Sequence, residues 1–238
     1  MDYDAFLALV KKRRSIRRFK PDPVPDEYVD KIIEAARWAP SSANSQPWEF
    51  LVIREKETRD KIVDLIDATK AETYRMEQTR EERLRHPGGR SAAPEEALRQ
   101  APVLIVVLGD PRMKEASILT AVHNHGDANL NTSLANAFIY MHLAAASLGL
   151  GSRYVSSTSS PFVQAMMKDL LGIPKQLEIY DTIALGFRAG EPRPRLVREK
   201  SELVHRGRYD RSKFRSDKEV EDFIARIHRD RIAPAPGA

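Results

Sequence analysis

The 238-residue sequence contains no cysteine. This absence excludes a disulfide framework, a thiolate nucleophile, and any metal or iron–sulfur site that depends on cysteine ligands. Long apolar runs are absent too: residues 103–108, among the longest, fall far short of the roughly 20 residues that a helix needs to span a bilayer. We therefore expect no membrane partner. The first 15 residues begin acidic, the reverse of a secretory signal, which favours a cytoplasmic location.

The common phosphate-binding and metal-binding motifs are also missing. Neither GxxxxGK followed by Ser or Thr nor GxGxxG occurs in the sequence. His123-Asn124-His125 has the only metal-like spacing, but no carboxylate stands at a telling interval, so we predict no metal site. His142 falls in an apolar helical pattern and is interpreted as a core histidine with satisfied hydrogen bonds. No nucleophile with a base and an orienting group can be recognised from the spacing.

The composition is that of an ordinary globular protein. Hydrophobic residues make up 42% and charged residues 31%, which is enough apolar material for a sizeable core. The 39 basic and 34 acidic residues give a net charge of +5, a mild excess that suits an anionic cofactor or nucleic acid. The lack of interleaved aromatic and basic residues makes nucleic-acid binding the less favoured alternative, and we expect no nucleic-acid partner. The length is compatible with a single α/β-type domain, 1–238.

Hydrophobic periodicity predicts the secondary structure. Helices are expected over residues 3–12, 26–38, 56–85, 127–148, 162–171 and 218–227, and buried strands over 49–54, 101–108 and 181–187. Two segments of short polar side chains, 40–48 and 152–157, are expected to be loops. Trp38 and Trp48 flank the first of these loops, and core packing is the default interpretation for both. The turn-rich residues 86–91 are interpreted as either a lid over a site or an exposed linker.

Residues 13–19, Arg-Arg-Ser-Ile-Arg-Arg-Phe, place four guanidinium groups and a hydroxyl at the end of the first predicted helix. A planar guanidinium suits phosphate oxygens, and a serine hydroxyl can add a further bond to the same group. A solvated charged face is the alternative interpretation. A second arginine cluster lies in residues 191–198, and the two clusters could meet on one phosphate or hold separate anions. The two small-polar loops could bind a flat polar ring.

Three separated segments together resemble the FMN-dependent nitroreductase family. They are residues 13–19, residues 39–48 (APSSANSQPW), and residues 148–152 (LGLGS) with 171–174 (LGIP). The resemblance covers about 5–54 and 127–210. It implies an α+β fold: a three-layer sandwich with a mostly antiparallel central sheet flanked by helices. It also implies a homodimer with two FMN molecules at the subunit interface.

The resemblance assigns roles to particular residues. Arg13, Arg14 and Ser15 are expected to face the FMN phosphate and ribityl chain. Arg17 is expected near the pyrimidine edge of the ring, where it could stabilise the flavin anion. Other residues implied to bind the cofactor are Pro40, Ser41, Ser42 and Asn44 from the neighbouring subunit, the backbone at Val155, Ser156 and Ser157, and Arg195 or Arg198 at the phosphate.

The resemblance also divides the chain. Residues 56–99 do not match the family pattern and are expected to form a variable excursion or lid that shapes substrate specificity. Residues 188–238 are expected to form a C-terminal extension that wraps the partner subunit, because such a polar tail cannot build a core alone.

The implied activity is an NAD(P)H oxidoreductase. FMN would carry the redox chemistry, with NADH or NADPH as the donor. A nitroaromatic, quinone or similar electron-poor acceptor would then be reduced by ping-pong hydride transfer through flavin N5. The alternative within the same fold is a flavoenzyme that uses FMN for reductive dehalogenation, flavin fragmentation or dehydrogenation.

Overall fold

The computed structural model describes residues 2–85, 93–116, 126–192 and 195–232. The chain divides into two compact units, the first made of Met1–Glu72 with Ala92–Glu191 and the second of Thr73–Ser91 with Pro192–Ala238. The proposed lid at 86–91 and the histidines His123 and His125 lie outside the described residues. The domain boundaries expected from the sequence stay predictions.

The first unit is built around a four-stranded sheet. Its strands are β1 (Trp48–Ile53), β2 (Val103–Gly109), β3 (Gly151–Val155) and β4 (Glu178–Gly186). Their order is β1-β2-β4-β3, and each neighbouring pair is antiparallel. β2 is buried along its whole length, as its unbroken apolar sequence predicts. β3 forms one edge of the sheet.

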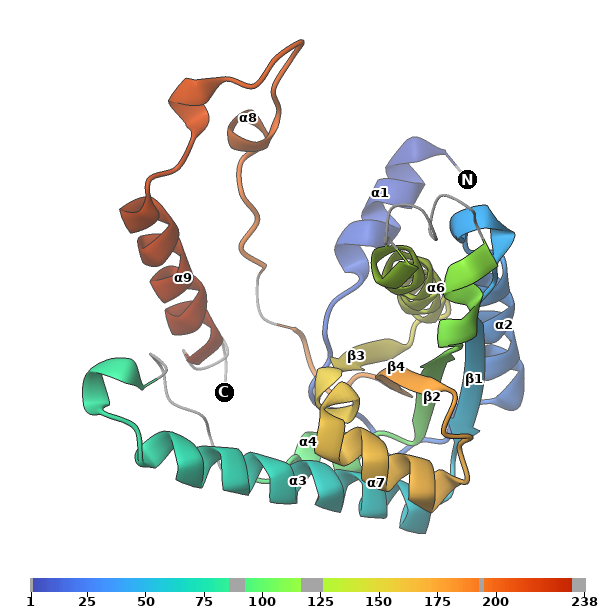
Figure 1. Ribbon diagram of the computed structural model, residues 1–238. Coiled ribbons are helices and arrows are strands. Elements are labelled where there is room, and N and C mark those ends of the chain that lie inside the picture. The colour runs from blue at the N-terminus through green and yellow to red at the C-terminus, as the bar shows by residue number, and fades with distance from the viewer. Residues whose placement is uncertain (1, 86–92, 117–125, 193–194, 233–238) are drawn as a thin grey trace. The chain divides into compact units, whose positions relative to one another are not determined.

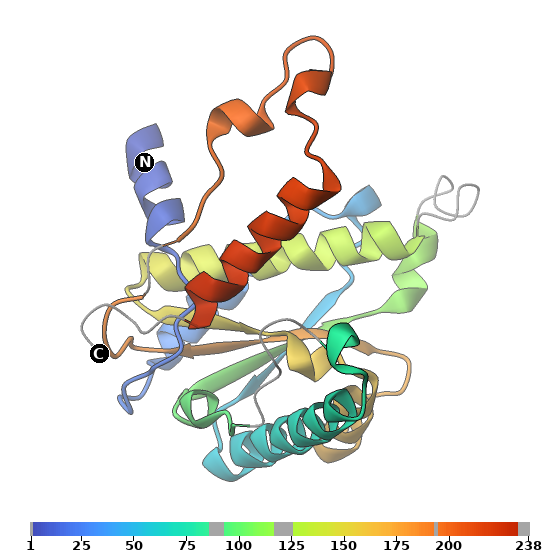
Figure 2. The same cartoon turned by 90° about the vertical axis from the view of Figure 1, so that its left-hand side faces the viewer.

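Helices cover both faces of this sheet (Figures 1 and 2). One face carries α2 (Asp26–Arg37) and α6 (Gly126–Ser147), and the other carries α4 (Glu96–Arg99), α7 (Pro161–Leu171) and the first part of α3 (Lys56–Gln78). Alternate strand residues serve the two cores: Ile105 packs with the α2 and α6 side and Val106 with the other. This arrangement confirms the predicted α+β sandwich with an antiparallel sheet.

The long helix α6 is the central element of its layer. It is apolar around most of its circumference, and Leu134, Ala137 and Met141 are almost completely buried. The helix is followed by Gly149, whose φ of 78° is a left-handed conformation that favours glycine. Its 22 residues extend about 33 Å at about 1.5 Å per residue, so residues at its two ends contribute to different parts of the molecule.

The first helix, α1 (Tyr3–Lys12), delivers the arginine cluster to the sheet edge. Asp2 caps its N-terminus by accepting a 2.7 Å hydrogen bond from the Ala5 amide. After Arg13 the backbone becomes extended, and Ser15 forms a parallel bridge with Ser152 of β3. The segment after the helix therefore runs beside the edge strand.

Two interpretations of the sequence were wrong. Residues 152–157 were expected to be a loop, but Gly151–Val155 pairs with β4 as strand β3, because pairing with a buried neighbour outweighs weak local propensity. Trp38 was expected to pack in the core, but it is 77% exposed, and its indole N–H donates to Glu34. His142, in contrast, is buried as expected.

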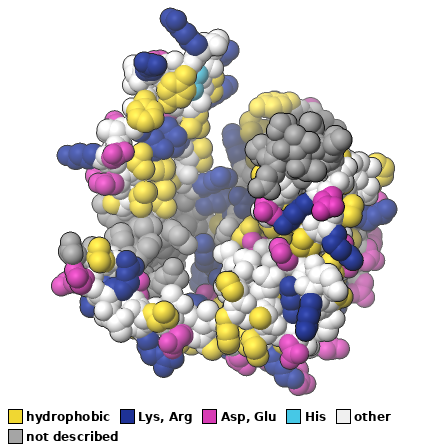
Figure 3. All heavy atoms as spheres, in the orientation of Figure 1, with side chains coloured by type: hydrophobic (Ala, Val, Ile, Leu, Met, Phe, Trp, Pro, Cys, Tyr) yellow, Lys and Arg dark blue, Asp and Glu magenta, His cyan; other side chains and the backbone are white. Residues whose placement is uncertain are grey.

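The remaining elements are short or belong to the second unit. The 3-10 segments are η1 (Ser42–Asn44), η2 (Glu82–Leu84), η3 (Pro111–Ala116), η4 (Ser156–Ser159) and η5 (Arg211–Lys213), and the helices of the C-terminal extension are α8 (Lys200–Leu203) and α9 (Asp217–Ile232). Hydrophobic side chains gather on this extension (Figure 3). Its exposed large hydrophobic residues include Tyr209, Phe214 and Ile224. None of the described helices combines the length and the apolarity that a bilayer crossing requires.

We expect Gly151→Ala to destabilise the fold. A Cβ at this position would lie 2.7 Å from Cγ1 and 3.0 Å from Cβ of Ile16, a branched side chain close to its backbone, so the 15–16 segment would have to move away from β3. The expected loss is about 1–3 kcal/mol of unfolding free energy, measured by urea denaturation.

Gly109→Ala is the matched control. Its new Cβ would meet Cδ1 of Leu134, the far end of a side chain that can rotate, so the loss should be smaller. If both variants lost the same unfolding free energy, the contact between Ile16 and Gly151 would not be the tighter of the two.

Candidate functional site

A hollow lined by basic side chains lies where α1 ends and β3 begins. We call it the basic hollow; the polar residues that line it are Lys12, Arg13, Arg14, Ser152 and Arg188. Within the described part of the chain, its lining includes no carboxylate. Arg13 and Arg14 are half-buried, which favours guanidinium groups that are held rather than fully solvated. The charges and the hydroxyl are suited to an anion with several oxygen acceptors, such as a phosphate.

Backbone hydrogen bonds fix the position of these cations. The Ile16 amide donates to the Ser152 carbonyl oxygen at 2.9 Å. Farther along, the Lys20 amide donates to Phe187 and the Ala189 amide donates to Arg18, which places Arg188 beside the same segment. Two distant parts of the sequence therefore supply charge to one hollow.

A neutral histidine lies beneath the basic hollow. His142 of α6 is 4% exposed, and its Nδ1 is 2.7 Å from the hydroxyl oxygen of Ser152. Burial, reinforced by the nearby charge of Arg13, lowers the pKa of His142 to about 4. The imidazole is therefore neutral near pH 7 and shares a hydrogen bond with Ser152 without adding another positive charge.

A row of rings continues from His142 between α6 and the sheet. The Phe138 ring centroid is 5.0 Å from that of His142, 4.6 Å from Tyr154 and 6.0 Å from Tyr180. The pairs with Phe138 have edge-to-face geometry, which suits the quadrupoles of aromatic rings. This row joins the basic hollow to the opposite end of β3.

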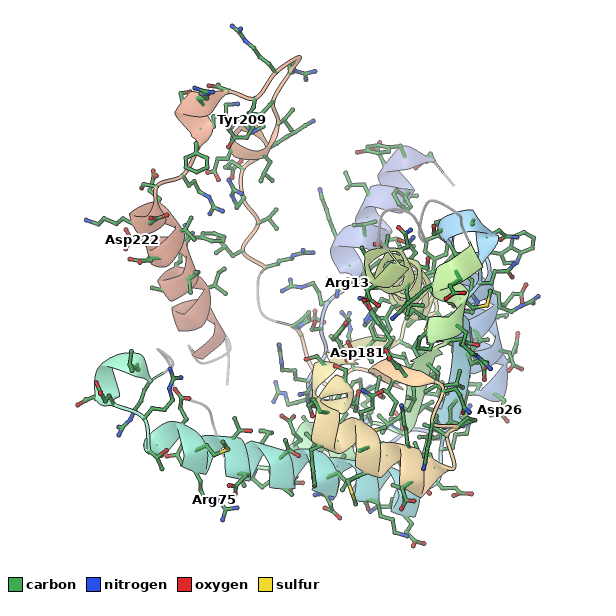
Figure 4. All side chains as sticks on the ribbon, viewed as in Figure 1. Arg13, Asp26, Arg75, Asp181, Tyr209 and Asp222 are labelled. Carbon is green, nitrogen blue, oxygen red and sulfur yellow. The ribbon has the colours of Figure 1, made fainter. Side chains whose placement is uncertain are left out.

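A buried carboxylate ends the row. Asp181 of β4 is 5% exposed, and Figure 4 labels it together with Arg13. Burial raises the pKa of Asp181 to about 6, against the opposing effect of a hydrogen bond from the Tyr154 side chain. No described residue forms a hydrogen bond with the Oδ1 atom of Asp181.

The turn after β3 contains the next predicted site residues. Val155 is buried with its side chain in the core, so it can offer only backbone to a ligand. Ser156 is exposed and Ser157 is half-buried. At about 3.3 Å per residue, the four steps from Gly151 to Val155 place this turn about 13 Å from the start of β3. The edge strand thus connects the basic hollow to a turn with exposed polar groups.

The predicted small-polar loop, residues 40–46, lies against α6. The Ser42 amide donates to the Ser133 hydroxyl at 3.1 Å, and the Asn136 side chain donates to the Pro40 carbonyl at 3.0 Å. Within the loop, the Gln46 amide donates to the Ser41 hydroxyl.

The loop also has an unusual backbone. Ala43, Asn44 and Gln46 have φ values of 52°, 53° and 44°. A positive φ is uncommon for residues other than glycine and concentrates at functional sites. The loop is therefore a strained segment that the neighbouring contacts hold in place.

One chain does not bring the loop to the basic hollow. The loop contacts α6 at Ser133 and Asn136, whereas the basic hollow contacts α6 at Ala146. A rise of about 1.5 Å per residue separates Ser133 from Ala146 by about 20 Å along the helix. Pro40, Ser41, Ser42 and Asn44 are therefore not neighbours of Arg13 within the chain.

The other predicted basic residues do not line the basic hollow. Arg17 follows the bridge to β3 and is exposed. Arg195 and Arg198 belong to the second unit, where Arg198 pairs with Glu202 at 3.1 Å. That one of these two reaches the phosphate stays a prediction.

Several residues of the site were missed in the sequence. Lys12 directly precedes the arginine cluster, and Arg188 directly follows the strand predicted at 181–187. Each is a cation at the end of a predicted helix or strand, and this position could have identified it. Ser152 and Asp181 gave no such signal, because their importance depends on the pairing of β3 with β4.

The chain is similar to known proteins in both sequence and fold. The model of the nitroreductase family matches residues 10–187. The 5,6-dimethylbenzimidazole synthase of Rhodospirillum rubrum is 30% identical over 200 residues, covering 82% of this chain and 88% of its own length. Iodotyrosine deiodinase 1 of Rattus norvegicus is 28% identical over 183 residues, which cover 76% of this chain and 61% of the rat protein.

Solved structures also resemble the fold of this chain. A Desulfovibrio desulfuricans protein, provisionally named a nitroreductase and solved in complex with FMN, has a TM-score of 0.61 and 28% identity. The similarity covers 86% of this chain and 97% of that one.

The buried carboxylate predicts an effect on stability. The folded-state pKa of Asp181, about 6, lies above its unfolded value, so its ionisation weakens the fold as pH rises from about 4 to 6. Asp181→Asn should raise the unfolding free energy near pH 7.5 by about 1–3 kcal/mol, and this gain should vanish below about pH 4. Urea denaturation across this pH range measures both effects.

Asp30→Asn, at an exposed position of α2, provides the control and should change stability little at either pH. If Asp181→Asn lowered the unfolding free energy at about pH 7.5, the ionised Asp181 side chain would not be destabilising the fold.

Proposed function

Because this chain belongs to the nitroreductase family, we propose that it is an FMN-dependent oxidoreductase. It would use NADH or NADPH to reduce nitroaromatic, quinone or similar electron-poor acceptors. The observation that carries this proposal is the basic hollow at the start of β3, which combines four cationic side chains, Lys12, Arg13, Arg14 and Arg188, with the Ser152 hydroxyl.

The residues present fit the phosphate of FMN. A phosphate monoester carries up to two negative charges and three acceptor oxygens, which match several guanidinium groups and a hydroxyl. Arg13, Arg14 and Ser15 would hold the phosphate end, with Lys12 and Arg188 added by the structure. The exposed edge of β3 leads from this hollow to Ser156 and Ser157, whose backbone would face the ring.

FMN, when bound, supplies two-electron redox chemistry by ping-pong hydride transfer through its N5. The protein's residues would orient the cofactor and stabilise charge. Arg17 is exposed close to the phosphate-binding residues and would place positive charge at the pyrimidine edge of the ring. His142 is neutral near pH 7, so the phosphate charge would be balanced by the arginines and lysine rather than by the imidazole.

The complete site would require two chains. Pro40, Ser41, Ser42 and Asn44 lie about 20 Å along α6 from the basic hollow of their own chain. A homodimer would allow the 40–46 loop of one subunit to line the flavin bound to the other. The exposed apolar residues Tyr209, Phe214 and Ile224 of the C-terminal extension suit a segment that wraps a partner.

Names of relatives support the flavin chemistry and leave the acceptor open. A similar protein from Archaeoglobus fulgidus is provisionally named an NADH dehydrogenase/NAD(P)H nitroreductase. Others are named for deiodination and for dimethylbenzimidazole synthesis, so the alternative is another FMN-dependent reaction.

Spectroscopy and steady-state assays test the function. The purified chain should show the absorption bands of oxidised flavin, and NADH or NADPH should bleach them. Acceptors are then compared by turnover with nitroaromatics and quinones. Failure of both nicotinamide donors with FMN bound would favour the alternative, and inability to bind added FMN would overturn the proposal.

Arg13→Ala should weaken FMN binding by about 1.5–3 kcal/mol, because a charge-assisted hydrogen bond to phosphate is lost. Fluorescence titration of the FMN-stripped protein measures this change. Lys11→Ala removes an exposed cation of α1 that lies two residues before Arg13 and does not line the basic hollow, so it should leave the affinity nearly unchanged. Equal affinities for Arg13→Ala and the unaltered chain would show that Arg13 is only a surface charge.

Mixed dimers test the shared site. One variant carries Arg13→Ala, and another carries Ser41→Ala with Asn44→Ala in the loop. Each variant alone should bind FMN weakly, but a refolded mixture should regain tight binding, because each mixed dimer contains one site with both halves intact. Recovery should be absent if the loop and Arg13 act within one chain.

A further inference from the structure

A pocket with acidic side chains lies beside the turn that follows β3. We call it the acidic pocket; its polar lining consists of Asn131, Ser159, Gln164, Glu178, Tyr180 and Asp181. Leu130 and Leu134 of α6 supply an apolar wall. Its volume of about 330 Å³ is within the range of small-molecule binding sites.

Two connections join the acidic pocket to the proposed flavin site. Ser159 lines the pocket and belongs to η4, the same 3-10 segment as Ser156 and Ser157, whose backbone would face the ring. At about 2.0 Å per residue, Ser159 lies about 6 Å from Ser156 along this segment. Tyr154, on the edge strand just before η4, forms a side-chain hydrogen bond with Asp181 of the pocket. A molecule bound over the ring would therefore have this pocket beside it.

The charged side chains of the acidic pocket are all negative. Glu178 is exposed at the start of β4, and Asp181 is buried. Among the described residues that line the pocket there is no lysine, arginine or histidine. Burial raises the pKa of Asp181 to about 6, so its carboxylate is mostly ionised near pH 7.5. The unpartnered Oδ1 atom of Asp181 has almost no accessible surface, so this residue acts on a ligand through its charge and not through contact.

The neutral groups of the lining suit the body of an aromatic acceptor. Leu130 and Leu134 offer apolar contact. The side-chain oxygen of Gln164 accepts a 2.8 Å hydrogen bond from the Ile179 amide, so the NH2 group is the part of Gln164 that can donate to a ligand. Nitro and quinone oxygens can accept such a bond. The pocket thus offers an acceptor apolar contact and a donor together with negative charge.

We propose that the acidic pocket is part of the acceptor site and makes the enzyme select neutral and cationic electron-poor acceptors over anionic ones. This inference rests on the proposed flavin function, because an acceptor must approach the ring to be reduced. A carboxylate on the acceptor would be repelled by Glu178 and Asp181, and the described lining holds no cation to offset the repulsion. An ammonium group would instead be attracted to Glu178.

Three nitroaromatic acceptors that differ in the charge of one substituent test this selectivity. They are 2-(4-nitrophenyl)ethylamine, 2-(4-nitrophenyl)ethanol and 3-(4-nitrophenyl)propanoate, in which two methylene groups separate the charged or neutral group from the ring. At about pH 7.5 and low salt, kcat/KM of the FMN-loaded enzyme for the amine and the alcohol should exceed that for the acid by about tenfold. In Glu178→Gln the ratio of amine to acid should fall by about three- to tenfold, and added salt should lower the ratio in the unaltered chain, because Glu178 is exposed.

Binding without turnover gives an independent measurement. Unreactive analogues, in which a methyl group replaces the nitro group, are titrated into the oxidised FMN-loaded chain, and the change in flavin absorption reports occupancy beside the ring. The dissociation constant of the acid analogue should exceed those of the other two by about tenfold, and Glu178→Gln should narrow this difference. Glu27→Gln removes an exposed carboxylate of α2 outside the acidic pocket and should keep the selectivity of the unaltered chain in both measurements.

The outcomes separate this inference from the proposed function. Equal kcat/KM and equal binding for the three charges, or a preference for the acid, would overturn the inference and leave the flavin function intact. Unchanged selectivity in Glu178→Gln would also overturn it, because the acidic pocket would then not be the cause. A chain that binds no FMN would overturn the proposed function and this inference together.

Discussion

The hydrogen bond from the Ile16 amide to the Ser152 carbonyl oxygen is the contact on which the geometry of the basic hollow depends. It holds the extended segment after α1 against the edge strand and so places Arg13 and Arg14 beside the start of β3. Gly151 permits the close approach, because any Cβ there would collide with the Ile16 side chain. Arg13 and Arg14, which would be solvated if the segment were free, thus become part of the basic hollow.

The paired strands β3 and β4 carry groups of opposite charge at their two ends. The basic hollow lies at the start of β3, and the buried carboxylate of Asp181 lies near the start of β4, at the opposite end of the antiparallel pair. Between them His142 stays neutral near pH 7, since protonation would place a second positive charge in a buried position near Arg13. The row of rings therefore separates two regions of opposite sign without adding a charge of its own.

The sequence was sufficient for the elements whose patterns are strong and local. The helix predicted at 26–38 and the apolar strand predicted at 101–108 follow from hydrophobic periodicity, and the arginines at 13–14 follow from their chemistry. β3 was missed because its small polar residues have little intrinsic strand preference, and its conformation comes from pairing with β4. The placement of Asp181 depends on an irregular register between β2 and β4, which no local pattern encodes.

The strained 40–46 loop is held by α6, the same helix that contributes to the basic hollow at its other end. Left-handed conformations at residues other than glycine cost about 1 kcal/mol each, and Ala43 and Asn44 both adopt them. The contacts with Ser133 and Asn136 offset part of this cost and fix the loop at the N-terminal half of α6. Since the basic hollow lies at the other end of the same helix, these contacts keep the loop apart from Arg13 and Arg14 of its own chain. A rigid helix that separates the two halves of a site is an arrangement in which symmetric pairing of two chains can bring complementary halves together.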